Sequence, residues 1–124
     1  MANERILVVE GDVLIRLGIS NYLREAGFTV IEAANADDAW TYLMAEGSVD
    51  LVFSEIATPG ALDGVALARS IEANFIGLPV IITGGQDRAP PPGGWSFLAK
   101  PYAFGRAAAA ISEALGLKKP KDVP

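Results

Sequence analysis

Apolar residues occur along this chain in two patterns, as short continuous runs and as residues spaced three or four positions apart. Short β-branched runs bounded by turn residues are typical of buried strands, and the wider spacing predicts amphipathic helices. Five strands are therefore expected, at residues 5–9, 28–33, 50–54, 78–83 and 95–99. Helices are expected at residues 13–26 and 36–46, from Gly64 onward, and at residues 103–115.

The segment between the last two predicted strands departs from this alternation. Residues 86–94 contain three consecutive prolines, Pro90 to Pro92, and two glycines. Each proline removes a backbone donor and pushes the preceding residue toward extended geometry, so a long helix is excluded here. We expect the fourth helix of the alternating pattern to be shortened or missing. Aromatic residues would then be left less covered, and a partner is hypothesised to dock near Trp95, Phe97 and Tyr102.

The alternation of strands and helices predicts an α/β fold with a parallel sheet that is covered by helices on both faces. The 124 residues suffice for one domain, expected at residues 1–116, and residues 117–124 are expected to form a polar, disordered tail. The chain shows no run of membrane-spanning length and no signal peptide. We therefore expect a cytoplasmic protein that does not enter the membrane.

Composition excludes several kinds of site. The chain has no cysteine and no histidine, which excludes disulfides, Cys-based zinc sites, His metal ligands and phosphohistidine chemistry. Its formal net charge is −5, which disfavours a nucleic-acid partner. Any chemistry at a functional site therefore has to come from carboxylates, hydroxyls and lysines.

Polar residues gather where the predicted strands end. Glu10 and Asp12 follow the first strand, Glu55 the third and Lys100 the fifth, and Thr83 ends the fourth. Right-handed crossovers bring the C-terminal ends of parallel strands to one edge of the sheet, where ligands of open α/β sheets bind. Acids, a hydroxyl and a lysine together suit Mg²⁺ and a phosphoryl group. Asp12 is equally well placed to cap the next helix, and Glu55 taken alone could be a solvated loop acid.

Four motifs make the chain similar to the receiver domain of bacterial two-component response regulators, which has a flavodoxin-like (βα)5 fold. They are LVVEGD at 7–12, EIATPGALDG at 55–64, VIITG at 80–84 and FLAKPY at 97–102, and the resemblance covers residues 5–116. It implies a three-layer sandwich around a five-stranded parallel sheet in the order 2-1-3-4-5.

In that family, an aspartate at the end of the third strand accepts a phosphoryl group from a histidine kinase, with Mg²⁺ bound beside it. The resemblance assigns family roles by motif position. They are the phospho-acceptor position at Glu55, the acidic pair at Glu10 and Gly11, a carbonyl metal ligand at Ala57, phosphate contacts at Thr83 and Lys100, a switch aromatic at Phe97, and a cis peptide before Pro101.

Two positions depart from the family pattern. The acceptor position holds Glu55, which is about 1.5 Å longer than aspartate, and the second acidic position is Gly11, which has no side chain. Phosphoryl transfer depends on positioning and charge neutralisation, so both changes should impair it. No cofactor is expected, and Mg²⁺ would bind Glu10, Glu55 and Ala57 only if the protein is phosphorylation-competent. Glu55 either contacts Lys100 directly as a fixed negative charge or belongs to a pocket that has lost its chemistry.

The expected function is that of a stand-alone atypical receiver in a two-component phosphorelay, which acts by protein–protein interaction and is not an enzyme. The alternative is a phosphorylatable receiver with autophosphatase activity that accepts a phosphoryl group on Glu55 or Asp12. A flavodoxin-like FMN binder is a third class, but the acids at residues 10–12 would repel a phosphate. The expected partner is a histidine kinase or a downstream effector, and the expected state is a monomer or weak dimer.

Overall fold

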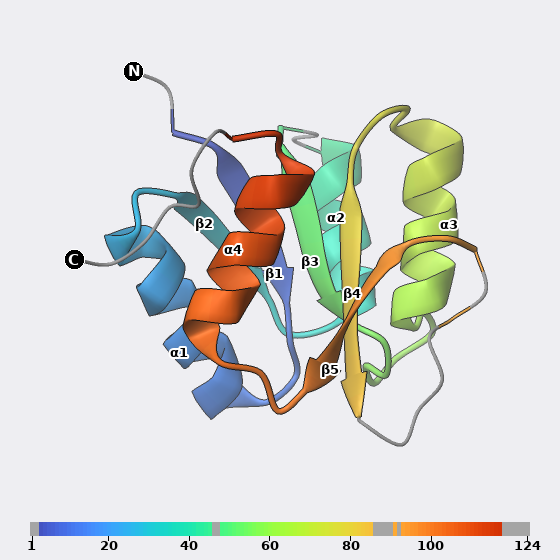
Figure 1. Cartoon of the computed structure of the whole chain (residues 1–124). Helices are drawn as coiled ribbons and strands as arrows, with labels where there is room; N and C mark the ends of the chain where they lie inside the picture. The colour runs from blue at the N-terminus through green and yellow to red at the C-terminus, as the bar shows by residue number, and fades with distance from the viewer. Residues whose placement is uncertain (1–2, 46–47, 86–90, 92, 118–124) are drawn as a thin grey trace.

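Five parallel strands form the sheet at the centre of the molecule (Figure 1). The computed structural model describes residues 3–45, 48–85, 91 and 93–117. The strand order is β2-β1-β3-β4-β5, as predicted, so β2 and β5 form the two edges of the sheet. The strands are β1 (Arg5–Val9), β2 (Thr29–Ala33), β3 (Leu51–Glu55), β4 (Val80–Gly85) and β5 (Ser96–Lys100).

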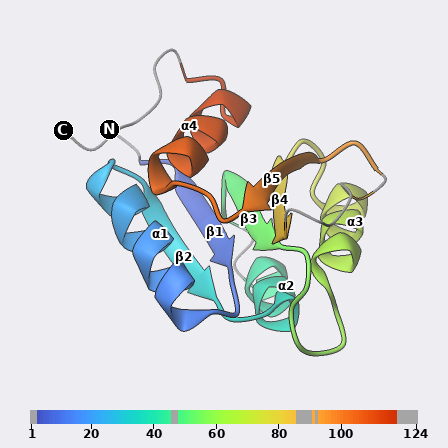
Figure 2. The same ribbon diagram turned by 60° about the horizontal axis from the view of Figure 1, so that its bottom comes forward.

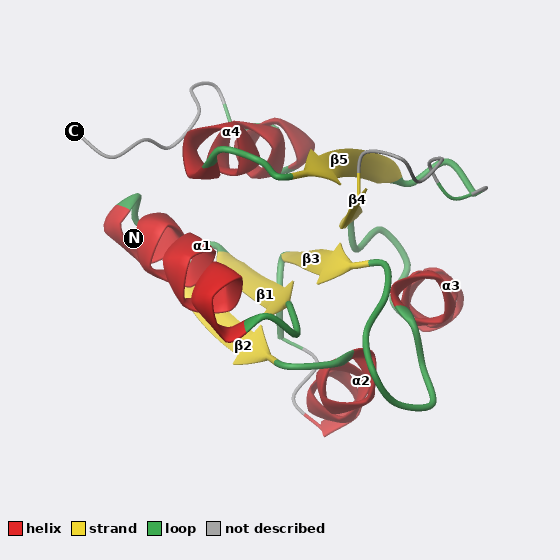
Figure 3. Ribbon diagram, turned by 90° about the horizontal axis from the view of Figure 1, so that it is seen from below, coloured by secondary structure: helices red, strands yellow, loops and turns green. Residues whose placement is uncertain are grey.

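Within the described residues, four helices cover the two faces of this sheet. They are α1 (Val13–Glu25), α2 (Ala36–Ala45), α3 (Gly64–Asn74) and α4 (Phe104–Ala114). Seen from the edge where the strands end, α1 and α4 lie on one face and α2 and α3 on the other (Figure 3). The first and last helices are therefore neighbours (Figure 2), and the ring centroids of Tyr22 and Phe104 lie 6.1 Å apart between them.

Each face of the sheet has its own hydrophobic core, because successive side chains of a strand point to opposite faces. In β1, Leu7 and Val9 pack in the core with residues of α2 and α3, whereas Ile6 and Val8 pack in the core with residues of α1 and α4. All four side chains are at most 1% exposed. Burying a large aliphatic side chain contributes about 1.5–3 kcal/mol, so the central strands are strongly held and the positions of their ends are fixed.

The predicted bounds agree with the observed ones to within two residues, and α3, for which the sequence predicted only a start, begins at Gly64 as expected. The largest difference is at β4, which was predicted from residue 78 and begins at Val80. The N–H of Leu78 donates to the carbonyl of Phe75 at 3.1 Å in the turn after α3, so this residue belongs to the turn. Asp12 and Asp63 cap α1 and α3 as the sequence indicates.

The connection between β4 and β5 is the irregular part of the fold. Residues 91 and 93–95, which the structure describes, are not helical. The remaining proline-rich residues, and the tail expected from 118 onward, lie outside the described residues. Trp95 is half-buried, and the backbone of Gly93 lies so close to its ring that a Cβ there would sit 2.3 Å from Cζ3. None of the helices in the described part of the chain has the length and apolar character needed to span a membrane.

Candidate functional site

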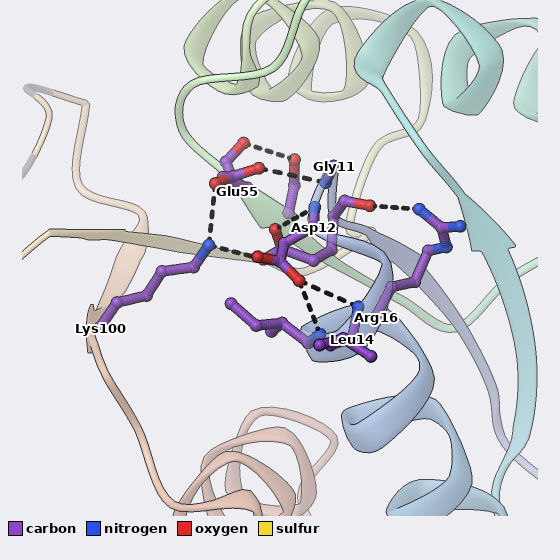
Figure 4. Close-up of polar contacts among 9 residues, drawn as sticks. Gly11, Asp12, Leu14, Arg16, Glu55 and Lys100 are labelled. Atoms are coloured by element: carbon purple, nitrogen blue, oxygen red, sulfur yellow. Dashed lines mark hydrogen bonds and ion pairs between the residues drawn. The ribbon is translucent and has the colours of Figure 1, made fainter.

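The C-terminal ends of β1, β3 and β5 bring three charged side chains together. Glu10 directly follows β1, and Glu55 and Lys100 are the last residues of β3 and β5. The strands end at one edge of the sheet, so residues 45 positions apart in sequence come into contact there. The close-up in Figure 4 shows Glu55 and Lys100 reaching toward each other across this edge.

Lys100 bridges the two carboxylates. Its Nζ lies 2.7 Å from Oε1 of Glu10 and 2.8 Å from Oε1 of Glu55 (Figure 4). Both distances are typical of strong hydrogen bonds between an ammonium and a carboxylate. The sequence offered a direct contact between Glu55 and Lys100 as one of two alternatives, and this contact is present. Glu10 binds the same ammonium.

The second oxygen of each carboxylate is held by the backbone. Oε2 of Glu55 accepts from the N–H of Gly11 at 3.2 Å, and Oε2 of Glu10 accepts from the N–H of Asp12 at 3.0 Å. Each glutamate therefore divides its oxygens between one ammonium and one backbone donor. This arrangement fixes the orientation of both carboxylates.

Asp12 takes the capping role that the sequence offered as one of two alternatives. Its Oδ1 accepts from the N–H groups of Leu14 and Ile15 at 2.9 and 3.1 Å, which satisfies free donors at the start of α1 (Figure 4). The side chain of Asp12 thus points toward α1. The backbone N–H of Asp12, and not its carboxylate, contacts Glu10. The Asp12 carboxylate is therefore committed to the start of α1 rather than to the cluster of Glu10, Glu55 and Lys100.

Burial and charge shift the titration of this cluster. Glu10 is 2% exposed, and burial raises the pKa of its carboxyl, with a further increase from the Glu55 carboxylate; the hydrogen bonds from Lys100 and Asp12 lower it only in part. Burial lowers the pKa of Lys100, but the hydrogen bonds to both glutamates outweigh this effect, so its pKa is raised overall. Lys100 therefore carries a firmly held positive charge at neutral pH.

The other residues expected at the site lie around this cluster. Thr83 is 1% exposed in β4 and is in register with Glu55 of the neighbouring strand. Ala57 is exposed in the loop after β3, and Phe97 is half-buried in β5. The peptide bond between Lys100 and Pro101 is cis, as the resemblance implies.

Comparison with known protein families shows which family this chain belongs to. The model of the response regulator receiver domain matches residues 6–112. The chain belongs to this family. The C4-dicarboxylate transport transcriptional regulatory protein DctD of Rhizobium meliloti is 35% identical over 107 residues, which are 82% of this chain and 23% of DctD. The two-component response regulator-like protein PRR37 of rice (Oryza sativa subsp. japonica) is 35% identical over 85 residues, 67% of this chain and 12% of PRR37. The chain thus spans less than a quarter of the length of these relatives.

Solved structures agree with this assignment. The receiver domain of the hybrid histidine kinase CckA has a TM-score of 0.76 and 29% identity, over 90% of this chain and 98% of that one. A response regulator receiver domain protein from Clostridium thermocellum has a TM-score of 0.82 over 91% of this chain and 94% of that one. At 24% identity this second likeness shows the fold alone.

Two polar residues of the receiver pocket were not identified as site residues from the sequence. Arg16 donates from Nη1 to the carbonyl of Glu10 at 2.8 Å and pairs through Nε with Glu32 at 3.4 Å, so it fixes the chain just after β1. In the sequence it reads as an outward residue of a helix, because its partners become neighbours only when the strands pair. The second residue that the sequence did not identify is Asp37, which the sequence pattern indicated only as an acid in the first turn of α2.

Asp37 anchors the loop that follows Glu55. Its Oδ2 accepts from the N–H of Ala61 at 2.9 Å, and Oγ1 of Thr58 accepts from the N–H of Ala36 at 3.3 Å. Gly60 has φ +113°, and a Cβ there would lie 2.1 Å from Oδ2 of Asp37, so only glycine allows this approach. The loop bearing Ala57 is thereby fastened to the start of α2.

The hypothesised docking aromatics do not share one side of the sheet. Trp95 and Phe97 pack against the core on the side of α2 and α3, whereas Tyr102 packs against the core on the side of α1 and α4. The ring of Tyr102 meets Phe53 edge to face with centroids 5.6 Å apart. Burial raises the pKa of Tyr102, and the carboxylates of Glu10 and Glu55 add to this increase. Trp95 and Tyr102 therefore lie on opposite faces of the sheet, because the chain after β5 turns to the other face, and docking of a partner near these residues stays a prediction.

Receiver domains use Mg²⁺ when they are phosphorylated, but this pocket does not fit the ion well. Mg²⁺ requires several oxygen ligands in near-octahedral geometry at about 2.0–2.1 Å. Here the ammonium of Lys100 lies between the two glutamates, Gly11 offers no side-chain oxygen, and the carboxylate of Asp12 is committed to α1. Within the part of the chain that the structure describes, no group of three or more acidic side chains is placed to hold a metal ion.

Proposed function

We propose that this receiver domain signals by binding partner proteins in a state that does not depend on phosphorylation of an aspartate. The observation that supports this most directly is the bond between Lys100 and Glu55, at 2.8 Å. Glu55 occupies the motif position of the phospho-acceptor, and its carboxylate binds the lysine that would otherwise contact a phosphoryl group. The pocket thus carries its own negative charge at this place.

The chemistry of phosphoryl transfer supports the same proposal. An acceptor carboxylate needs a free oxygen aligned with the incoming phosphorus, and catalysis rests almost wholly on positioning and charge neutralisation. Both oxygens of Glu55 are engaged, one by Lys100 and one by the N–H of Gly11. The Lys100 ammonium balances part of the negative charge of the two glutamates.

The surface offers a place where a partner could bind. A groove of about 380 Å³ runs between the end of α3 and the first residues of β4 and β5. Phe75, Ile76 and Trp95 line it, and Ile76 is 96% exposed. Exposed apolar surface of this kind is typical of interaction sites. We propose that a histidine kinase or an effector protein docks here, beside the irregular connection between β4 and β5.

Incubation with acetyl phosphate and Mg²⁺ tests the proposal. We expect no acid-labile, hydroxylamine-sensitive phosphoryl group on the protein by intact mass spectrometry, and no change in its affinity for a partner kinase or effector identified by cross-linking. Incorporation of a phosphoryl group that is lost in Glu55→Gln or in Asp12→Asn would instead establish the phosphorylatable alternative. An exposed-surface variant, Glu25→Gln, is the control for non-specific modification.

A further inference from the structure

We propose that the partner of this receiver docks through a basic amphipathic helix, which lies beside α3 over the first residues of β4 and β5. The described residues of the connection between these two strands form no helix there. This inference deepens the proposed function and rests on it, because it names the kind of partner that the groove beside α3 takes.

The first argument is the arrangement of the layers. The steps from β3 to β4 and from β4 to β5 run in the same direction across the sheet. Right-handed crossovers therefore place both connections on one face, which is the face that carries α2 and α3 (Figure 3). Residues 91 and 93–95 of the second connection are not helical, so α3 is the outermost helix described on this face. Parallel sheets are covered by helices on both faces, so the strip beside α3 has the position of a further helix.

The second argument is that the side chains of this strip are apolar and only partly covered. Trp95 and Phe97 are alternate residues that point to the face of α2 and α3, and both are half-buried. Phe75 and Ile76, just after α3, line the groove of about 380 Å³ together with Trp95, and Ile76 is 96% exposed. Grooves of this kind take apolar side chains that recur every three or four residues along a partner helix.

The third argument is charge. Glu72 of α3 is exposed and is the only charged residue among the described residues that line the groove. The whole chain has a formal net charge of −5. Lysines or arginines beside the apolar stripe of a helix complement both features, because complementary charges favour encounter and like charges oppose it. The same charge disfavours an acidic helix and a second copy of this chain as the occupant.

A synthetic amphipathic peptide tests this inference. The probe is a fluorescein-labelled helix of about 15 residues, with leucines three and four residues apart and lysines elsewhere. We expect saturable binding in fluorescence anisotropy, with amide NMR shifts centred on residues 72–80 and 94–96. Ile76→Gln should weaken binding by at least about tenfold. Leu14→Gln, which changes an 80% exposed apolar residue of α1, is the matched control and should bind like the wild type.

A charge reversal tests the second half of the inference. Glu72→Lys should weaken binding of the lysine peptide and strengthen binding of a peptide in which every lysine is replaced by glutamate. Glu25→Lys makes the same change in net charge at an exposed position of α1 and should have the smaller effect on both peptides. Equal effects of the two variants would show that the attraction is not local to the groove and would overturn the assignment of a basic helix.

Three further outcomes would overturn the inference. The first is no saturable binding to the wild type, and the second is equal weakening by Leu14→Gln, which would place the peptide on α1. The third is undiminished binding of a peptide with a central proline, which would indicate an extended occupant. Phosphoryl incorporation into the wild type would refute the proposed function without changing peptide binding, so the two failures are distinguishable.

Discussion

Lys100 Nζ lies 2.8 Å from Oε1 of Glu55, although β5 and β3 are separated in the sheet by β4. The two long side chains together span the intervening strand end. An aspartate at the position of Glu55 would be shorter by one carbon–carbon bond, about 1.5 Å, and could not keep contact with both Lys100 and the N–H of Gly11. The contact therefore depends on the length of the Glu55 side chain.

Restoring the family residues should restore the family chemistry. The double variant Gly11→Asp with Glu55→Asp is expected to bind Mg²⁺ in the millimolar range or tighter and to accept a phosphoryl group from acetyl phosphate. A Cβ at Gly11 meets nothing closer than the carbonyl of Ala34 at 3.5 Å, so the new side chain fits. Amide NMR shifts and intact mass report the two events. Each single variant should respond only in part, and an inert double variant would contradict the proposed correspondence of positions.

Glu10 should make stability depend on pH in a defined direction. Burial raises the pKa of its carboxyl above the ordinary value of 4.5, so the native state holds this proton more tightly than the unfolded state. The stabilisation linked to the proton is then complete below about 4.5 and is lost as the pH rises through the higher native value. In urea unfolding, the wild type should lose stability relative to Glu10→Gln between pH 4.5 and neutral pH. A gain over the same range would contradict the direction of the shift.

Asp37 should control the order of the loop after Glu55. Asp37→Ala removes the acceptor of the Ala61 N–H and should cost about 1 kcal/mol of unfolding free energy. Amide hydrogen exchange should quicken across residues 57–62 while the sheet remains protected. Asp38→Ala is the matched control, since Asp38 lies in the same helical turn but contacts Asn35 and not the loop. Equal exchange in both variants would show that Asp37 does not anchor the loop.

Gly64 should not tolerate alanine. A Cβ there would lie 2.3 Å from the carbonyl oxygen of Glu55 and 2.8 Å from Cα of Ile56, and neither backbone atom can move freely. Gly64→Ala should therefore destabilise the fold by about 1–3 kcal/mol, even though alanine favours a helix. Gly105→Ala in α4 is the comparison, since its Cβ would meet only the Tyr22 hydroxyl, at 3.2 Å. Chemical unfolding of the two variants measures the difference.

The sequence pattern by itself determined the elements and the edge where the polar residues gather, and the sheet order was implied by the resemblance to the receiver family. Strand and helix periodicities are local patterns, and the caps Asp12 and Asp63 act within a few residues of the helices they start. The parallel α/β topology follows from the alternation, because right-handed crossovers leave few other arrangements. Even the pairing of Glu55 with Lys100 was one of two interpretations that the motif positions offered.

Only the tertiary structure decided how the charges at this edge are shared. Glu10 joins the Lys100 contact, Asp12 turns to α1, and Arg16 and Asp37 hold the two loops that flank the pocket. The contacts of Glu10 with Lys100 and of Asp37 with Ala61 join segments that are far apart in the chain. The direction of a side chain after a strand end is set by the turn that follows and by the core beneath it. No pattern of residue types along the sequence records that information.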